Sequence, residues 1–477
     1  MKEKRIRQLF IAAFILMLVL PLLLTSFKKD VVSEIENRTL ANFPKLTMAD
    51  GEKNPNFIPE FESWFNDHVG FREPLFEANL KLQYDLFDHS ANEKVMVGKD
   101  GWLFFTGDGN AAIPAGEYPN FGEKELEAIC QKQISIRDKL KSQGIEYVIM
   151  LPPSKVSIYP EYIKGDFSVR KTPSDILADY LEAHSDLKVV RLKDTLLEEK
   201  EKTDELLYFK TDTHWNTYGS SVAYRQLVKK LKEWKLTDTE AAEMTLIKED
   251  KTRDLSKMLV SDQEHYTEES YTRFEIQDPS AVFVESGELY EYVQQYITDN
   301  GITRGYNYVN ENQDLPSYLV FSDSMFMNWM AGMVAENCSA LTAIQKPTIS
   351  QEMIDVVKPD VVILEMVERY LNTMAQDDYC NAFLHVTIQK QGELVEISYK
   401  DDGAYQHMWF PVWSNDNSGD IIWHEAERSD DNTWHVTVNL ADYGANGVYN
   451  VHFYQSEDSL DHAVSVHTDR FDIGNLF

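Results

Sequence analysis

Cysteine, metal-ligand spacings and positive charge are all scarce in this chain of 477 residues. Its three cysteines, Cys130, Cys338 and Cys380, form no C-x-x-C pair, which excludes the usual zinc ribbons and dithiol redox motifs. One disulfide among them stays open, but the odd number leaves a free thiol. The histidines show no H-x-x-x-H spacing, so we expect no metal site and no cofactor.

Basic residues are few: 46 Lys and Arg stand against 79 Asp and Glu, a net charge of -33. Such a charge opposes extended contact with phosphate backbones, so we expect no nucleic-acid partner. A polyanionic ligand is disfavoured too, although salt screens the repulsion beyond about 8 Å. A neutral polymer is a better match to this composition as a ligand.

Only one long apolar run is present, from Leu9 to Phe27, and basic residues precede it on the N-terminal side. Its nineteen residues would cover about 28 Å as a helix, close to the ~30 Å hydrocarbon core of a bilayer. We therefore predict a cytoplasmic tip and transmembrane helix over 1–29, a linker over 30–56, and an extracytoplasmic remainder. A cleaved signal peptide is the alternative, but no A-x-A site follows the run.

Residues 57–378 show the pattern of an α/β domain. An amphipathic helical segment over 57–88, broken near Gly70 and Pro74, precedes a hairpin with an Asp-Gly turn at Asp100-Gly101. Short apolar strands then alternate with helical segments, which predicts a mostly parallel sheet. The pattern weakens over 236–313, where we predict an insertion. Functional residues are expected at the carboxyl ends of the parallel strands.

Residues 379–477 change character to seven short alternating segments separated by turns, which predicts an all-β sandwich. Segments such as Phe410–Ser414 and Gly447–His452 resemble the Bsp-type repeat domain of cell-surface proteins. Surface aromatic rings can stack on sugars, so carbohydrate binding is one interpretation, although most of these tryptophans are expected in the core.

One loop carries the candidate chemistry. Asp212 and His214 are two residues apart, a spacing at which a carboxylate can orient an imidazole and stabilise its cation. A structural interpretation is open as well, since an acid and a histidine often fall two apart on polar loops. Trp215 can exclude water from the pair, and Asn216 can cap the helix that follows.

The matching nucleophile is Ser324, where an apolar strand over 317–321 runs into a helical pattern. Backbone N–H groups at such a turn can stabilise the oxyanion formed during acyl transfer, although a serine there can also be a simple helix cap. Asn328, about one turn later, is a candidate second oxyanion donor. Lys155, Arg369 and Tyr370 follow strands that end at the same edge, where either substrate contact or a structural role fits.

Five segments in order resemble the extracytoplasmic SGNH-hydrolase-like family of the alginate O-acetyltransferases. They are Gly98–Phe104 (GKDGWLF), Pro152–Lys155 (PPSK), Asp212–Trp215 (DTHW), Ser322–Ser324 (SDS) and Val367–Tyr370 (VERY). The resemblance implies a flavodoxin-like α/β domain with a circularly permuted motif order, because the Asp-His pair precedes the serine. It also implies transfer of acetyl groups to hydroxyls of an exported polysaccharide.

By this resemblance Ser324 is the nucleophile, His214 the base and Asp212 its orienting partner, and a membrane-bound O-acyltransferase supplies the acetyl group. Lys155, Trp215, Asn328, Arg369 and Tyr370 are candidate substrate contacts. The family usually has glycine where this chain has Ser322, and a side chain there can crowd the oxyanion hole. A carbohydrate acetylesterase and a non-catalytic glycan-binding or scaffold protein of an exopolysaccharide system therefore stay open as alternatives.

Overall fold

The computed structural model of this chain is described over the following residues. The described residues are 2–29, 31–33, 38–47, 53–87, 89–90, 92–107, 110, 121–165, 171–251, 255–256, 269–376, 378–401, 406–414, 418–430, 432–443 and 447–472.

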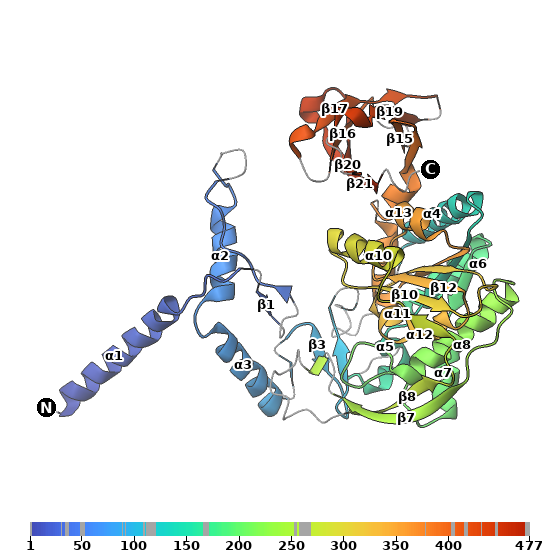
Figure 1. Ribbon diagram of the computed structural model, residues 1–477. Coiled ribbons are helices and arrows are strands. Elements are labelled where there is room, and N and C mark those ends of the chain that lie inside the picture. Colours follow the sequence, from blue (N-terminus) through green and yellow to red (C-terminus); the bar gives the residue numbers. More distant parts are fainter. Residues whose placement is uncertain are drawn as a thin grey trace.

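The N-terminal segment forms three helices, α1 (Lys2–Leu23), α2 (Phe57–His68) and α3 (Arg72–Phe87). Within the described residues, α1 contains the one stretch long and apolar enough to cross a membrane, by length and composition. The predicted break near Gly70 is confirmed, since α2 ends at His68 and α3 begins at Arg72. The break predicted near Pro74 is wrong, because Pro74 lies in the first turn of α3, where the helix has no backbone hydrogen bond to lose. Figure 1 shows α1 and α3 leaving the same corner, with α3 on the side of the main domain.

The predicted hairpin is also present, with β3 (Val95–Val97) paired antiparallel to β4 (Leu103–Phe105). Asp100 and Gly101 have φ angles of 54° and 79°, the left-handed conformations that suit Asp-Gly in a tight hairpin turn. Leu80 of α3 is fully buried against the hairpin, which joins the helix to the rest of the molecule.

A seven-stranded sheet forms the centre of the α/β domain, in the order β6-β5-β13-β11-β12-β10-β9. The first five of these strands are parallel. At one edge β10 pairs antiparallel with β12, and β9 pairs antiparallel with β10. The bounds are β5 (Glu146–Leu151), β6 (Lys188–Arg191), β9 (Ala281–Phe283), β10 (Gly305–Asn310), β11 (Tyr318–Phe321), β12 (Ala340–Ile344) and β13 (Val361–Glu365).

The strand order shows the circular permutation directly. If the parallel strands are counted from β11 onward and the count continues at β5, their spatial order from β12 to β6 becomes 2-1-3-4-5. This is the order of flavodoxin-like sheets. The predicted SGNH-like α/β fold is therefore confirmed, and β11, which carries the nucleophile candidate, is the first strand of the unpermuted order.

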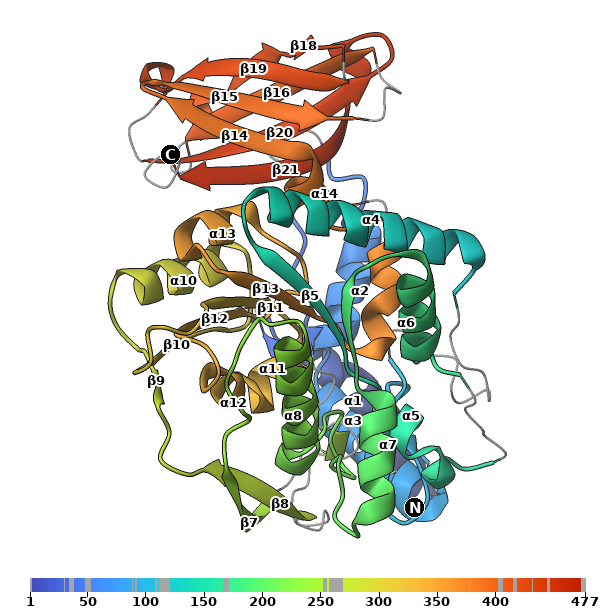
Figure 2. The same cartoon turned by 90° about the vertical axis from the view of Figure 1, so that its right-hand side faces the viewer.

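Helices cover both faces of this sheet, which makes a three-layer domain (Figure 2). One buried cluster joins the sheet to α5, α7, α8, α11 and α12, and the other joins it to α4, α6, α10, α13 and the 3-10 helix η5. The bounds are α4 (Glu123–Ser142), α5 (Lys155–Ile158), α6 (Pro173–His184), α7 (Lys193–Lys202), α8 (Thr217–Glu233), α10 (Glu288–Asp299), α11 (Ser324–Trp329), α12 (Ala331–Ala335), α13 (Gln351–Val357) and η5 (Glu368–Ala375).

The stretch predicted as an insertion, 236–313, contributes to this domain in two ways. A separate antiparallel pair, β7 (Met244–Lys251) and β8 (Glu269–Ile276), lies beside α8, whereas β9, α10 and β10 belong to the main sheet and its covering layer. Residues 252–254 and 257–268 of the stretch lie outside the described residues.

The C-terminal part forms two four-stranded antiparallel sheets around one apolar core, as the alternating pattern predicts. The seven predicted strands are present, and β18, only two residues long, is an eighth. The short helix α14 (Asn381–His385) leads from the core of the α/β domain into this sandwich. The strands are β14 (Val386–Gln391), β15 (Leu394–Lys400), β16 (His407–Ser414), β17 (Ile422–Glu425), β18 (Glu427–Arg428), β19 (Thr433–Asn439), β20 (Val448–Ser456) and β21 (Val464–Asp472).

Candidate active site

The loop that carries Asp212 and His214 connects α7 to α8 and is folded back on itself. An isolated bridge pairs Tyr208 with Trp215, so the loop closes as a tight hairpin. The side-chain oxygen of Asn216 accepts the backbone N–H of Gly219 at 2.9 Å, which makes Asn216 the N-cap of α8, as predicted. The end of this loop is therefore fixed by the start of a long helix.

Asp212 and His214 form a tight, buried pair. Asp212 Oδ1 lies 2.6 Å from His214 Nδ1 and also accepts the backbone N–H of His214 at 3.0 Å. Burial favours a raised pKa for Asp212, but the charge of His214 and its two hydrogen bonds outweigh burial and lower the pKa to about 2. Asp212 is thus a carboxylate at neutral pH. Because Nδ1 of His214 faces Asp212, Nε2 of the same ring faces the next group.

That next group is Ser324, whose Oγ lies 2.7 Å from His214 Nε2. Ser324 is the first residue of α11, and two residues separate it from the end of β11. Asp323 caps the helix, since its Oδ1 accepts the backbone N–H of Met325 at 2.7 Å. Among the described residues no acceptor takes the backbone N–H of Ser324, as expected for a first helical turn.

Trp215 joins the two segments of the site. Its Nε1 donates to the backbone oxygen of Met325 at 3.1 Å, and its ring is fully buried. A fully buried ring offers no surface to a substrate in this conformation, so what the structure shows for Trp215 is a link between the His214 loop and the Ser324 turn.

Asn328 lies on the same side of α11 as Ser324, one turn later. Its Nδ2 is 3.4 Å from His214 Nε2, and its Oδ1 accepts a hydrogen bond from Arg304. Arg304 takes the amide oxygen, and the amide nitrogen of Asn328 faces His214. Arg304 was not identified from the sequence; its signal would have been a cation just before β10, a strand that the weak pattern over 236–313 conceals.

Lys155 is buried beneath the Asp212 loop. Its Nζ donates to three backbone oxygens, those of Phe209 at 3.1 Å, Lys210 at 3.0 Å and Asp212 at 2.7 Å. An ammonium group has three N–H donors, and these carbonyls can use all of them. Lys155 therefore holds the loop in place, and substrate contact by this residue stays a prediction.

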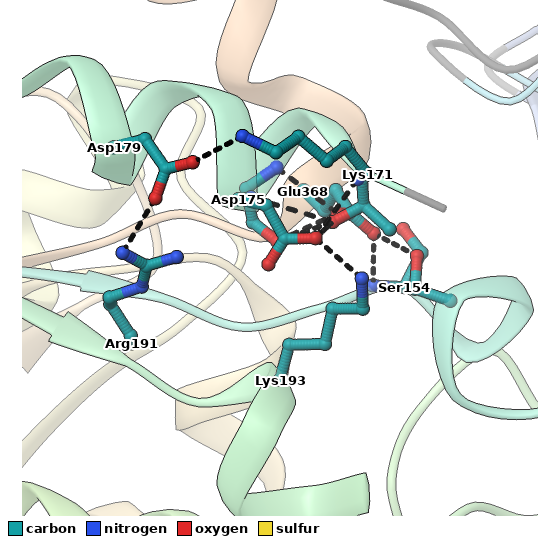
Figure 3. A network of polar contacts seen from close by, with 10 residues as sticks. Ser154, Lys171, Asp175, Asp179, Arg191, Lys193 and Glu368 are labelled. Atoms are coloured by element: carbon teal, nitrogen blue, oxygen red, sulfur yellow. Dashed lines mark hydrogen bonds and ion pairs between the residues drawn. The ribbon is translucent and has the colours of Figure 1, made fainter. Parts of the chain in front are cut away.

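Glu368 connects this region to the far side of the domain. Its fully buried carboxylate accepts hydrogen bonds from the backbone N–H groups of Ser154 and Ser174, and from the hydroxyls of Ser157 and Ser174. Figure 3 shows Glu368 beside the ion pair of Lys193 with Asp175 at the start of α6. The carboxylate thus fixes the turn that presents Lys155.

Arg369 and Tyr370 follow Glu368 in η5. The guanidinium carbon of Arg369 lies 4.8 Å from the centre of the Tyr370 ring and 5.8 Å from that of Phe105 in the β3–β4 hairpin. Arg369 is almost completely buried, whereas Tyr370 is half-buried. These contacts give Arg369 a packing role, and substrate contact by either residue stays a prediction.

A second buried acid, Glu365, lies behind the Ser324 turn at the carboxyl end of β13. Its Oε2 accepts the backbone N–H of Asp323 at 2.9 Å, and Asp323 Oδ2 in turn accepts the backbone N–H of Val367 at 2.7 Å. Burial, and then the negative charge of Asp323, raise the pKa of Glu365 well above its ordinary value. The protein environment therefore favours the protonated form of Glu365. Its sequence signal, an acid at the end of an apolar strand, was not used.

Ser322, the departure from the usual glycine, is fully buried. Its backbone N–H donates to the oxygen of Ile344 at 3.0 Å, and its Oγ is buried without a hydrogen-bond partner. The hydroxyl is therefore enclosed by protein and does not line the exposed side of Ser324.

All three cysteines are buried free thiols, so no disulfide forms among them. Within the described ranges, no three His, Cys, Asp or Glu side chains group in a way that could hold a metal ion.

Comparison with known proteins agrees with the motifs. Residues 95–304 match the SGNH hydrolase-like domain of the acetyltransferase AlgX, and residues 387–469 match the GBS Bsp-like repeat. The probable alginate O-acetylase AlgJ of Pseudomonas fluorescens is 29% identical over 150 residues, which are 31% of this chain and 36% of that protein. AlgJ of Pseudomonas syringae pv. tomato is 32% identical over 178 residues, which are 36% and 42% of the two chains.

Among solved structures, the O-acetyltransferase domain of Pseudomonas putida AlgJ aligns at 17% identity with a TM-score of 0.40, over 58% of this chain and 92% of that one. The chain spans less than half the length of the two curated AlgJ relatives described above. The matches to the two family descriptions and to the AlgJ relatives confirm the resemblance read from the motifs, together with the Bsp-like C-terminal module.

Proposed function

We propose that this chain is an extracytoplasmic O-acetyltransferase, anchored by α1, that moves acetyl groups onto hydroxyls of an exported polysaccharide. The observation that carries the proposal is His214, whose two ring nitrogens lie 2.6 Å from Asp212 and 2.7 Å from Ser324. This is the arrangement of a serine nucleophile, its base and the orienting carboxylate. The match to an acetyltransferase domain supports acetyl as the transferred group.

In the first half of the proposed reaction, His214 takes the proton of Ser324 as Oγ attacks the acetyl carbonyl of the donor. The bond from the carbonyl carbon to the donor oxygen breaks, His214 returns the proton to that oxygen, and acetyl-Ser324 remains. Asp212, ionised because its pKa is about 2, stabilises the imidazolium in between.

The backbone N–H of Ser324 and Nδ2 of Asn328 supply the donors for the oxyanion. Each such donor typically contributes about 2.7 to 4 kcal/mol to the transition state. Arg304 acts as a positioning residue, because it occupies the amide oxygen of Asn328 and so directs the N–H groups toward the site.

In the second half, a sugar hydroxyl attacks acetyl-Ser324 while His214 takes the hydroxyl proton and returns it to Ser324 Oγ. The likeness to a probable alginate O-acetylase supports an exported polysaccharide as the acceptor. A membrane-bound O-acyltransferase as the source of the acetyl group is what the motif resemblance implies. The basic residues before the apolar run favour a cytoplasmic N-terminus, which leaves the site outside the cell.

Mass spectrometry of the full chain incubated with a small acetyl ester tests the covalent step. We expect one acetyl group on Ser324 in the wild type and none in Ser324→Ala. A wild-type protein that never gains the acetyl group overturns the mechanism. An acetylesterase would load Ser324 in the same way, so adding an oligosaccharide acceptor separates the two: the transferase yields acetylated sugar and the esterase yields acetate.

A glycan-binding role is favoured by one feature of the C-terminal sandwich. The rings of Trp413, His452, Tyr454 and Trp423 form a continuous run on β16, β20 and β17, with successive centroids 4.6, 6.4 and 4.9 Å apart. Trp423 is 43% exposed, and the core residues of these strands point to the opposite side. Such a run offers stacking surfaces for sugar rings.

A glycan-binding scaffold without catalysis predicts normal polymer acetylation in a Ser324→Ala strain with normal protein levels. The transferase predicts its loss. Mobility of the Trp423→Ala protein in gels containing the strain's own purified polysaccharide tests the aromatic run separately.

A further inference from the structure

Helix α3 has two apolar sides, and only one of them is used inside the protein. Phe76, Leu80 and Tyr84, spaced four residues apart, pack on the β3–β4 hairpin. Leu75, Leu82 and Leu86, spaced seven and four apart, form a second stripe that is 66%, 52% and 66% exposed. We call this second set the outer stripe. A soluble surface helix needs only one apolar stripe, so the outer stripe requires an explanation.

The position of α3 relative to α1 indicates what covers the outer stripe. The backbone N–H of Gly70 donates to Pro21 O at 3.0 Å, and that of Ser26 donates to His68 O at 3.0 Å. A Cβ at Gly70 would lie 2.6 Å from Pro21 O, so glycine permits this close contact. The corner where α3 begins is therefore fixed to the last turn of the candidate membrane span in α1.

Aromatic residues surround the same corner. Phe27, Phe43, Phe61 and Trp64 pack together, with Trp64 centroids 4.9, 4.7 and 5.5 Å from those of Phe27, Phe43 and Phe61. Phe27 and Phe43 remain exposed at 67% and 42%. Phe27 is the last residue of the apolar run, so this cluster lies where the candidate span leaves the hydrocarbon region, which places the start of α3 at the level of the lipid headgroups.

We propose that the outer stripe of α3 lies on the surface of the bilayer into which α1 inserts. The inference rests on the anchoring proposed above. At about 1.5 Å per residue, α3 covers about 24 Å of membrane surface. Its other side packs on β3–β4, and the backbone N–H of Leu103 in that hairpin donates to Lys210 O at 2.9 Å, two residues before Asp212.

This arrangement has a consequence for the proposed reaction. Contacts then run from the bilayer through α3 and the β3–β4 hairpin to the Asp212 loop, so contact with lipid holds the active site close to the membrane. Figure 1 shows α3 and β3 between α1 and the main domain. A donor loaded by an enzyme inside the membrane then reaches Ser324 without leaving the membrane surface.

Site-specific labelling of the full chain in phosphatidylcholine nanodiscs tests the inference. Neutral lipid is chosen because the net charge of -33 opposes binding to anionic lipid. The native thiols are buried, so a single Cys introduced at Leu82 or Leu86 accepts an NBD fluorophore selectively. We expect blue-shifted emission and quenching by spin-labelled lipid for L82C and L86C, and water-like emission for D85C on the neighbouring polar side.

L18C, inside α1, tests the anchoring separately from the contact between the outer stripe and lipid. Quenching at L18C together with water-like emission at L82C and L86C retains the anchor and overturns the proposal. The same result is expected if the stripe binds a protein partner, because the nanodiscs hold this chain alone. An unquenched L18C overturns the anchoring itself and with it this inference.

A functional variant provides an independent readout. L75E/L82E/L86E is expected to lower the acetyl occupancy of Ser324 in cells, where the membrane supplies the acetyl group, but not with a soluble ester in vitro. L75M/L82M/L86M, which keeps the stripe apolar, is the matched control and should behave as wild type. Equal losses in both assays would contradict a role in approaching the membrane.

Discussion

Two buried carboxyl groups flank Ser324, and their pKa values are shifted in opposite directions. Asp212 faces His214, which lowers its pKa to about 2, whereas Glu365 is buried behind Asp323, and burial and then that neighbouring charge raise its pKa. Each acid accepts a backbone N–H, from His214 in one case and Asp323 in the other. The difference between them lies in the charge of the neighbour.

The opposite shifts imply opposite effects on stability. Asp212 contributes stability above the pKa of an unfolded aspartate, and this is lost as the pH falls toward 2. Glu365 holds a proton that the unfolded chain releases, so its contribution weakens as the pH rises above about 4.3. The fold is thus stabilised by the charged form of Asp212 and by the protonated form of Glu365.

The largest effect is expected from Asp212→Asn. The amide cannot stabilise the imidazolium and favours the wrong tautomer of His214, so the rate of Ser324 acetylation should fall by about 10⁴-fold. Single-turnover kinetics with a small acetyl ester measure this rate. A loss below about tenfold would mean that Asp212 only supports the loop.

Lys155→Met is expected to destabilise the fold by about 3 kcal/mol or more, because it leaves three buried backbone oxygens without their charged donor. Chemical denaturation gives the free energy of unfolding. Lys99→Met is the matched control: Lys99 is exposed and donates to one backbone oxygen, so a change within about 0.5 kcal/mol is expected. Equal effects of the two substitutions would refute a special role for Lys155.

The parts of the site that could be predicted from sequence are local. Asp212, His214, Trp215 and Asn216 are contiguous, and the strand-to-helix setting of Ser324 is readable within ten residues. The turn at Asp100-Gly101 was equally accessible, because Asp-Gly has few alternatives there. These features required no knowledge of how distant segments meet.

The remainder depends on contacts between distant segments. Arg304 reaches Asn328, which lies 24 positions later with β10 and β11 between them in the chain, and Glu368 binds residues more than 190 positions earlier, so no single helix or strand contains either interaction. Strand β10 was missed for another reason: it lies near the sheet edge, alternates buried and partly exposed residues, and carries two Asn and a Gly. The two-residue strand β18 offers no period at all.

Glu365→Gln sharpens the comparison between the two acids. The amide oxygen can still accept the Asp323 N–H, but the side chain no longer carries a proton to release on unfolding. The variant should therefore gain stability relative to wild type as the pH rises from 5 to 8, with Ser324 acetylation retained. Unfolding free energies across this pH range measure the effect. A difference that does not change with pH would show that Glu365 is ionised in the fold.

The smallest effect is expected from Ser322→Ala. The Ser322 hydroxyl is buried without a partner, so its removal should stabilise the fold by about 1 kcal/mol. Because this hydroxyl is enclosed behind the Ser324 turn, the acetylation rate should stay within about twofold of wild type. A rate that rises tenfold would instead show that Ser322 crowds the oxyanion donors. In that case crowding of the oxyanion donors by Ser322, and not the pair of His214 and Asp212, limits the reaction in this chain.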